Sequence, residues 1–215
     1  MEQIENLRTW ASDIEDVTLQ QALTASRLPI LAGPMALMPD AHLGKGATIG
    51  SVIPTKGAII PSAVGVDIGC GMIAVETDLR LDQLPDDLEP LLARFAEGIP
   101  AGLGRWHRDP SDAARAWLAE HPHEPLTSKQ EEKAMVQFGT LGSGNHFLEA
   151  AADERDIVWL VMHSGSRGVG NQLAMKHIAL ARKQEQSLED PDLAYFLEGT
   201  PQFEAYVRDM LWAQE

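Results

Sequence analysis

The most restrictive feature of this 215-residue chain is a stretch of low charge and high glycine content at positions 27–77. It holds eight of the chain's 18 glycines, and its three basic residues balance its three acidic residues. Short apolar runs at 47–53, 58–60 and 72–76 are separated by glycine and proline, a pattern typical of short buried strands joined by turns. The stretch therefore predicts packed short strands in which the backbone comes close to other atoms.

Apolar spacing and capping residues predict helices around these strands. We expect helices at 3–11, 15–26, 85–96, 111–120, 128–137, 171–186, 191–197 and 201–215, and further strands at 146–150 and 157–162. Asp13, Ser111 and Ser128 are the expected caps, with Glu131 completing a capping box. Strands interspersed with unequal helices indicate an α+β fold, which we expect to form a single domain over 1–215.

Composition excludes several classes of protein. The net charge of −15 argues against a basic surface that coats nucleic acid, although it leaves room for a local phosphate site. No apolar run approaches the roughly 20 residues that span a bilayer, and the acidic amino terminus does not resemble a signal peptide. The absence of such a run predicts no membrane partner. A single cysteine forbids an intrachain disulfide, so we expect a cytoplasmic protein.

The first candidate site is the sequence VGVDIGCGM at 64–72. Asp67 and Cys70 lie three residues apart, and the glycines between and after them permit a turn that brings carboxylate and thiolate to one ion. A lone cysteine is also commonly buried and inert. A carboxylate among valine, isoleucine and glycine is harder to explain without a partner, because burying it unpaired costs several kcal/mol.

Two histidines follow at glycine-marked ends of expected strands. His146 comes after the glycines of GTLGSGNHFLE at 139–149, and His163 ends the apolar run at 157–162. Taken alone, each fits a core histidine with satisfied hydrogen bonds better than a ligand. Together with Asp67 and Cys70 they form a mixed oxygen, sulfur and nitrogen set, which suits Mn, Fe, Co or Zn better than Ca or Mg.

Two further loops carry polar residues. SGSRGVG at 164–170 precedes a helix and offers backbone N–H groups and Arg167 to an anion, or is a plain loop with a capping serine. PDAHLGKG at 39–46 places Asp40, His42 and Lys45 in one loop, where they can position phosphate, support a metal site from outside, or form a surface turn.

These motifs resemble the RtcB family of RNA-splicing ligases. The resemblance rests on three blocks that occur in the family's order over 39–174: PDAHLGKGATIGSVIPTKGAIIPSAVGVDIGCGM, GTLGSGNHFLE and VMHSGSRGVGNQLA. It implies an RtcB-like fold and a ligase that joins an RNA 3′-phosphate or 2′,3′-cyclic phosphate end to a 5′-hydroxyl end in tRNA splicing or RNA repair. The family uses GTP and Mn²⁺, with two ions in the full site.

The resemblance also implies roles for individual residues. It makes metal ligands of Asp67, Cys70, His146 and His163, with Cys70 bridging two ions. It places Asn145, Phe147 and Glu149 beside the guanylate, and Arg167 beside the terminal phosphate of the RNA.

One departure from the family affects the reaction itself. The family's remaining histidine ligand and its guanylylated histidine lie in a carboxy-terminal part, and the only histidine after His163 is His177, within an expected helix without a matching motif. We therefore expect a fold incomplete at its carboxy terminus, without an assigned catalytic nucleophile, that binds divalent metal but does not ligate alone and needs a carboxy-terminal half or second chain.

Two other functions fit the same residues. A short paralogue can act as a metal-dependent RNA phosphoesterase, because the four ligands and Arg167 can still activate water. Alternatively the chain is a non-catalytic assembly module that docks through the apolar face of its last expected helix, which carries Phe203, Tyr206, Val207, Met210 and Leu211. Docking of that helix on the chain's own core explains the same face.

Overall fold

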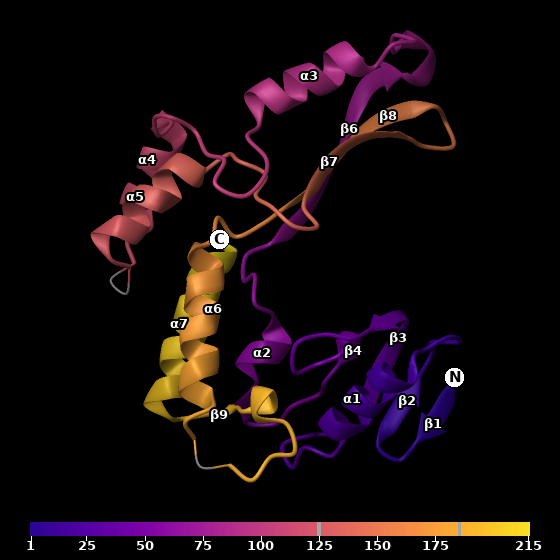
Figure 1. The fold of residues 1–215 in the computed structure, drawn as a ribbon, viewed down its shortest axis with the longest axis vertical. Coiled ribbons are helices and arrows are strands. Elements are labelled where there is room, and N and C mark those ends of the chain that lie inside the picture. The colour runs from indigo at the N-terminus through magenta and orange to yellow at the C-terminus, as the bar shows by residue number, and fades with distance from the viewer. Residues whose placement is uncertain (124–125, 185) are drawn as a thin grey trace. The chain divides into compact units, whose positions relative to one another are not determined.

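The computed structural model describes residues 1–123, 126–184 and 186–215 and has a mixed α+β fold (Figure 1). In chain order the elements are β1 (Glu2–Ile4), β2 (Leu7–Thr9), α1 (Asp16–Ser26), β3 (Met35–His42), β4 (Ile49–Val52), β5 (Ala58–Ile59), α2 (Pro61–Val64), β6 (Gly71–Arg80), α3 (Glu89–Gly98), α4 (Asp112–Glu120), α5 (Ser128–Gln137), β7 (Phe147–Ala152), β8 (Ile157–Ser164), α6 (Val169–Ala181), β9 (Phe196–Leu197) and α7 (Pro201–Gln214). Short 3₁₀ turns lie at Leu81–Gln83 and Pro191–Leu193.

The chain divides into two compact units. Unit 1 comprises Met1–Val66 and Gln172–Met210, and unit 2 comprises Asp67–Asn171 and Leu211–Glu215. The boundaries fall just before Asp67, early in α6 and late in α7. The expectation of a single domain over 1–215 stays a prediction, and each unit is described by itself.

Unit 1 is built on a four-stranded sheet in the order β1-β2-β3-β4. β1 and β2 form an antiparallel hairpin, β2 and β3 pair in parallel, and β3 and β4 are antiparallel. The crossover between the parallel strands carries α1, as parallel pairing requires a long connection. The β3–β4 register shifts between Leu37 and His42, where Pro39 cannot donate a ladder hydrogen bond.

The core of unit 1 forms between this sheet and α1. Leu7, Met35 and Leu37 of the sheet are fully buried and belong to one cluster with Ala22 and Leu23 of the helix. A second, two-stranded sheet pairs β5 with β9, and Leu193 joins the same cluster. α6 and α7 lie side by side, with Tyr206 of α7 fully buried against His177 of α6. At Tyr206 the apolar face of α7 is therefore covered by the chain itself.

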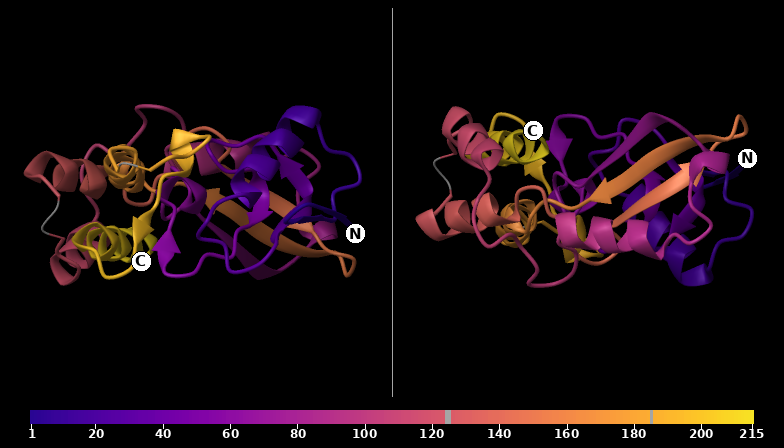
Figure 2. Two further views of the ribbon diagram at one scale, coloured as in Figure 1. Left: turned by 90° about the horizontal axis from the view of Figure 1, so that it is seen from below. Right: turned by 90° about the horizontal axis from the view of Figure 1, so that it is seen from above.

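Unit 2 contains a three-stranded antiparallel sheet in the order β6-β8-β7, whose strands run side by side in Figure 1 and Figure 2. Its central strand β8 carries the buried Val158. Every residue of the edge strand β6 is at least partly exposed, including Met72 at 62% and Ile73 at 51%. The ends of β6, β7 and β8 that lie near Gly71, Phe147 and Ser164 come together, because Gly71 pairs with Ser164 and Phe147 with His163.

Unit 2 also contains the helices α3, α4 and α5. Ser111 accepts a hydrogen bond from the backbone of Ala114 at 3.1 Å, as expected for a cap, and Thr127 caps α5 in a reciprocal pair with Gln130. Trp117 of α4 contacts the rings of Phe138 and Trp212, and the Trp212 indole donates to the backbone oxygen of His121. The last residues of the chain are thereby attached to α4.

Several expectations for individual elements are wrong. Residues 3–11 form the hairpin β1–β2 and not a helix, because alternate residues Leu7 and Thr9 face the core and pair with β3. Residues 191–197 form a 3₁₀ turn followed by β9, which pairs with β5. The capping box of α5 uses Thr127 and Gln130, one residue before Ser128 and Glu131, and Glu15 takes the cap position of α1 expected for Asp13.

The helix expected at 128–137 is present with those bounds as α5, and the other expected helices and strands are present with shifted ends. Across residues 1–123, 126–184 and 186–215, no helix combines the length and the apolar character needed to cross a membrane.

Candidate functional site

Asp67 lies in a turn directly before β6. Its backbone oxygen accepts a hydrogen bond from the N–H of Cys70 at 3.0 Å, and Gly69 between them has a φ of 88°. A Cβ atom at Gly69 would stand 1.9 Å from the backbone oxygen of Ala213. Glycine is thus required here both by the left-handed backbone and by the close approach of a second segment.

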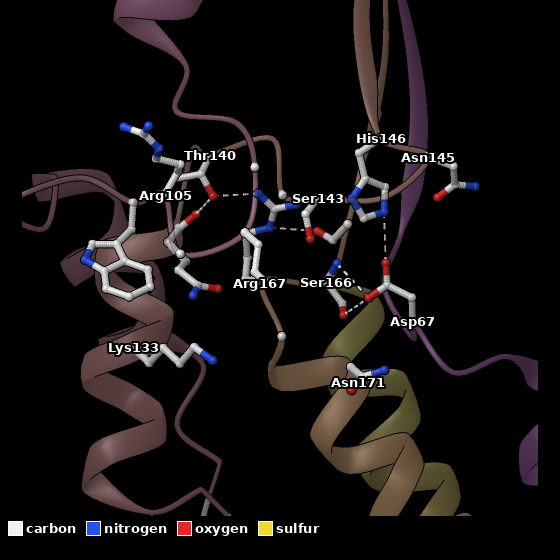
Figure 3. Close-up of a pocket in the computed structure, with 18 residues that line it drawn as sticks. Asp67, Arg105, Lys133, Thr140, Ser143, Asn145, His146, Ser166, Arg167 and Asn171 are labelled. Carbon is white, nitrogen blue, oxygen red and sulfur yellow. Dashed lines mark hydrogen bonds and ion pairs between the residues drawn. The ribbon is translucent and has the colours of Figure 1, made fainter.

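The carboxylate of Asp67 connects three separate segments of unit 2 (Figure 3). Its Oδ2 lies 3.0 Å from Nε2 of His146, which precedes β7, and its Oδ1 accepts hydrogen bonds from the backbone N–H and the hydroxyl of Ser166, which follows β8. The Asp67 side chain is 30% exposed and the His146 side chain 10% exposed. A half-buried carboxylate in this setting is stabilised by its partners, as the sequence argument required.

Two glycines hold the His146 ring. A Cβ atom at Gly165 would lie 2.1 Å from Cε1 of His146, and one at Gly142 would lie 2.8 Å from its Nδ1. The Nδ1 atom is buried and has no hydrogen-bond partner among the described residues. The direction of the ring toward Asp67 is therefore set by packing against bare backbone.

His163 and Cys70 lie near this pair without closing around it. The ring of His163, in β8, meets the ring of His146 edge-on at a centroid distance of 5.0 Å. Cys70 is an exposed residue. The pKa of its thiol is nevertheless raised, first because nearby protein atoms exclude part of the water around the sulfur and second because Asp67 is negatively charged. Within the described parts of the chain, no three His, Cys, Asp or Glu side chains are arranged to hold a metal ion.

The types of donor, and not their present spacing, suit a transition metal. The Asp67 oxygen and the His146 nitrogen are 3.0 Å apart, the distance of a hydrogen bond. A carboxylate, two imidazoles and a thiol form a mixed oxygen, nitrogen and sulfur set, which suits Mn, Fe, Co or Zn. Two of the four expected ligands are thus in direct contact, and the expectation for all four stays a prediction.

A cavity of about 570 Å³ opens beside the Asp67–His146 pair. Asn145 and Arg167 also line it (Figure 3). The guanidinium of Arg167 donates to the backbone oxygens of Gly165 and Leu141 and to the hydroxyl of Thr140, each at 2.7 Å. Burial lowers the pKa of Arg167, although a guanidinium stays charged. In this arrangement Arg167 organises the loop around the cavity, and its expected contact with a terminal phosphate stays a prediction.

The remaining expected residues occupy different places. Phe147 and Glu149 are exposed on β7, with Phe147 5.9 Å from the His163 ring. Asp40, His42 and Lys45 belong to unit 1, where Nδ1 of His42 lies 2.7 Å from the backbone oxygen of Asp40 and Lys45 approaches the sulfur of Met175 at 3.8 Å. Their expected roles near phosphate or a metal stay untested.

Sequence reasoning missed residues that complete the site. Ser166 donates to Asp67, and Thr140 accepts from Arg167. Gly142 and Gly165 lie against the ring of His146. The only signal for them was the density of glycine and serine in the two loops, which did not specify the partners.

Comparison with known proteins identifies the family. A family model described as tRNA-splicing ligase RtcB matches residues 21–215. The RNA-splicing ligase RtcB of Escherichia coli K12 is 43% identical to the chain, over 94% of the chain and 54% of that protein. The tRNA-splicing ligase RtcB of Nanoarchaeum equitans is 29% identical, over 88% of the chain and 51% of that protein. The chain therefore spans about half the length of these curated relatives, and it belongs to the RtcB family.

Proposed function

We propose that the chain forms the metal-binding part of an RNA ligase that joins 3′-phosphate or 2′,3′-cyclic phosphate ends to 5′-hydroxyl ends. The contact between Asp67 and His146 beside a cavity, in a chain of the RtcB family, is the observation that carries this proposal. GTP, Mn²⁺ and the RNA ends are the implied cofactors and substrates. The cytoplasmic location also stays a proposal, supported by the single cysteine.

Asp67 and His146, with Cys70 and His163, would hold Mn²⁺. The bound ion would polarise a phosphate and neutralise the charge that develops during phosphoryl transfer. Ser166 holds the second carboxylate oxygen of Asp67 in place, and Gly142 and Gly165 fix the His146 ring. Asn145 lines the cavity next to this pair, where its amide can orient a nucleotide, as the family resemblance implies.

End recognition by these 215 residues tests the proposal. Two RNA decamers of one sequence, one ending in a 3′-phosphate and one in a 3′-hydroxyl, are titrated against the chain with Mn²⁺, and binding is followed by fluorescence anisotropy. We expect tighter binding of the phosphorylated end, since an anionic terminus gains charge-assisted contacts at the site. Asp67→Ala should remove that preference, whereas Glu154→Ala, which removes an exposed carboxylate elsewhere in unit 2, should keep it.

Equal affinity for both ends in the unaltered chain would contradict the proposal. The same mixtures, supplied with GTP and a 5′-hydroxyl RNA, are examined for products. We expect no joined product from these residues alone, and release of inorganic phosphate without joining would instead favour a phosphoesterase.

A further inference from the structure

The cavity beside the Asp67–His146 pair is electropositive, although the chain as a whole is strongly acidic. Its charged lining residues are one carboxylate, Asp67, and three cations: Arg105, Lys133 and Arg167. The carboxylate is already bound by His146 and Ser166. In a chain with a net charge of −15, a wall of this sign concentrates anions at one place.

The three cations are not equally available. The guanidinium of Arg167 already donates three hydrogen bonds of 2.7 Å to other groups of the protein. Lys133 and Arg105 are exposed, and their side chains make no hydrogen bond or ion pair with another described residue. Lys133 extends from α5 toward the turn after Arg167, with its Nζ 3.5 Å from a Cβ position built at Gly168 (Figure 3). Lys133 is thus the cation of this wall best placed to bind an external anion.

An aromatic side chain stands on the same wall. Trp106 lines the cavity, yet the residue is 50% exposed. Its loop is attached on both sides, since Gly102 donates to the backbone oxygen of Gly142 at 2.7 Å and His107 donates to that of Val136 at 2.9 Å. Core packing does not explain a large apolar ring that a fixed loop holds at a solvent-exposed surface. Such a ring is typical of a binding site.

We propose that Lys133 and Trp106 form a subsite for the single-stranded RNA that flanks the reacting end, with Lys133 on a backbone phosphate and Trp106 stacked on a base. Arg105 adds positive charge to the same wall. Aromatic stacking beside a cationic groove is the usual way to bind single-stranded nucleic acid without reading its sequence. A volume of about 570 Å³ lies in the range of ligand cavities. This inference rests on the proposed function, because RNA ends are its substrate.

The test uses the 215-residue chain and a decamer RNA labelled at its 5′ end, titrated between about 50 and 200 mM salt. Lys133→Ala should weaken binding by up to about five-fold and lower the magnitude of the salt slope by about 0.7, the value for one phosphate of a single strand. Trp106→Ala should weaken binding by about ten-fold with the slope unchanged, and Trp106→Phe should retain most of the affinity.

Matched controls lie in the same chain. Lys129→Ala removes an exposed lysine one helical turn earlier on α5, outside the cavity lining, and Trp10→Ala removes a tryptophan that is 47% exposed in unit 1. Both should bind RNA like the unaltered chain. Equal effects of Lys133→Ala and Lys129→Ala, unchanged affinity in Trp106→Ala, or failure of the unaltered chain to bind RNA would each overturn the subsite.

A failure of the proposed function can be distinguished from a failure of the subsite. The subsite contacts the strand and not its end, so Lys133→Ala and Trp106→Ala should lower the affinity for 3′-phosphate and 3′-hydroxyl decamers by the same factor. If the chain shows no preference between ends but its RNA binding still depends on Lys133 and Trp106, the subsite stands and the proposed function does not. If the preference is present while both variants bind normally, the function stands and the subsite does not.

Discussion

The orientation of His146 depends on the absence of side chains at two glycines that lie against its ring. Its ring lies against Gly142 and Gly165, and its Nδ1 has no hydrogen-bond partner in the described part of the chain. Metal-binding histidines are usually held by a hydrogen bond from the second ring nitrogen. At His146 close packing holds the ring instead, so its orientation is sensitive to the addition of single methyl groups.

Gly165→Ala should disturb this packing directly. The new Cβ would stand 2.1 Å from Cε1 of His146, so the ring must leave its present position against Asp67. We expect the chain to lose about 1–3 kcal/mol of unfolding free energy from overpacking, and its affinity for Mn²⁺ to fall by about ten- to a hundred-fold. Urea denaturation and titration calorimetry measure the two effects.

Gly33→Ala provides the comparison. Gly33 has open space at its Cβ position and no positive φ, so alanine there should leave both stability and metal affinity nearly unchanged. Equal metal affinity in Gly165→Ala and Gly33→Ala would show that the packing of His146 does not control the site.

For individual residues, the sequence predicts the reactive groups better than it predicts the residues that surround them. Asp67 was identifiable because a carboxylate in an apolar segment needs partners. Ser166 was not, because it is 99 residues from Asp67 along the chain and nothing local to it indicates the contact. The sequence also did not indicate that the guanidinium of Arg167 binds the backbone oxygens of Gly165, in its own loop, and of Leu141, 26 residues earlier in the chain.

Among the elements, α6 and α7 are joined by a buried hydrogen bond between a histidine and a carboxylate. Nε2 of His177 donates to Oδ2 of Asp209 at 2.7 Å, and both side chains are at most 2% exposed. Arg208 and Lys176 also lie within 3.1 and 3.6 Å of the Asp209 carboxylate. Burial lowers the pKa of His177. Burial raises the pKa of Asp209, but hydrogen bonds from His177 and Arg208 outweigh it and lower the net value. His177 is therefore neutral and Asp209 ionised at neutral pH.

This pair predicts a loss of stability in mild acid. Because the pKa of His177 is lower in the folded chain, the unfolded chain takes up its proton first as pH falls below about 6.5. Stability should therefore be fully present above that pH and decrease below it, by up to about 1.4 kcal/mol per pH unit for this one proton. Urea denaturation at pH 7.5 and pH 5.5 measures the difference.

His177→Gln isolates this contribution, since glutamine keeps a donor for Asp209 but does not titrate. We expect the variant to lose less unfolding free energy than the unaltered chain between the two pH values. An identical loss in both proteins would exclude His177 as the titrating group.

The success of element prediction depended on where each element obtains its stability. Helices with local capping and spacing signals, such as α4 and α5, were found close to their true ends. The segment 3–11 was misassigned, because Ile4 and Leu7 also fit helical spacing and only pairing with β3 selects a strand. The β9 strand likewise exists through β5, which lies about 140 residues earlier.

For the whole molecule, family and α+β class were predictable and the division of the chain was not. The family motifs are continuous in sequence, whereas the two units each combine early and late segments. Asp67, His146 and Ser166 all belong to unit 2, so the candidate site is contained within one unit. We propose that this unit binds a divalent transition metal through Asp67 and His146.

Titration calorimetry of the 215-residue chain with Mn²⁺ tests that claim most directly. We predict saturable binding in the unaltered chain, retained in Glu154→Ala, weakened in Cys70→Ala, and lost in Asp67→Ala and His146→Ala because each removes one of the two donors that already meet. Circular dichroism confirms that each variant is folded. Binding of Mn²⁺ with the same affinity by folded Asp67→Ala and His146→Ala chains would contradict the account.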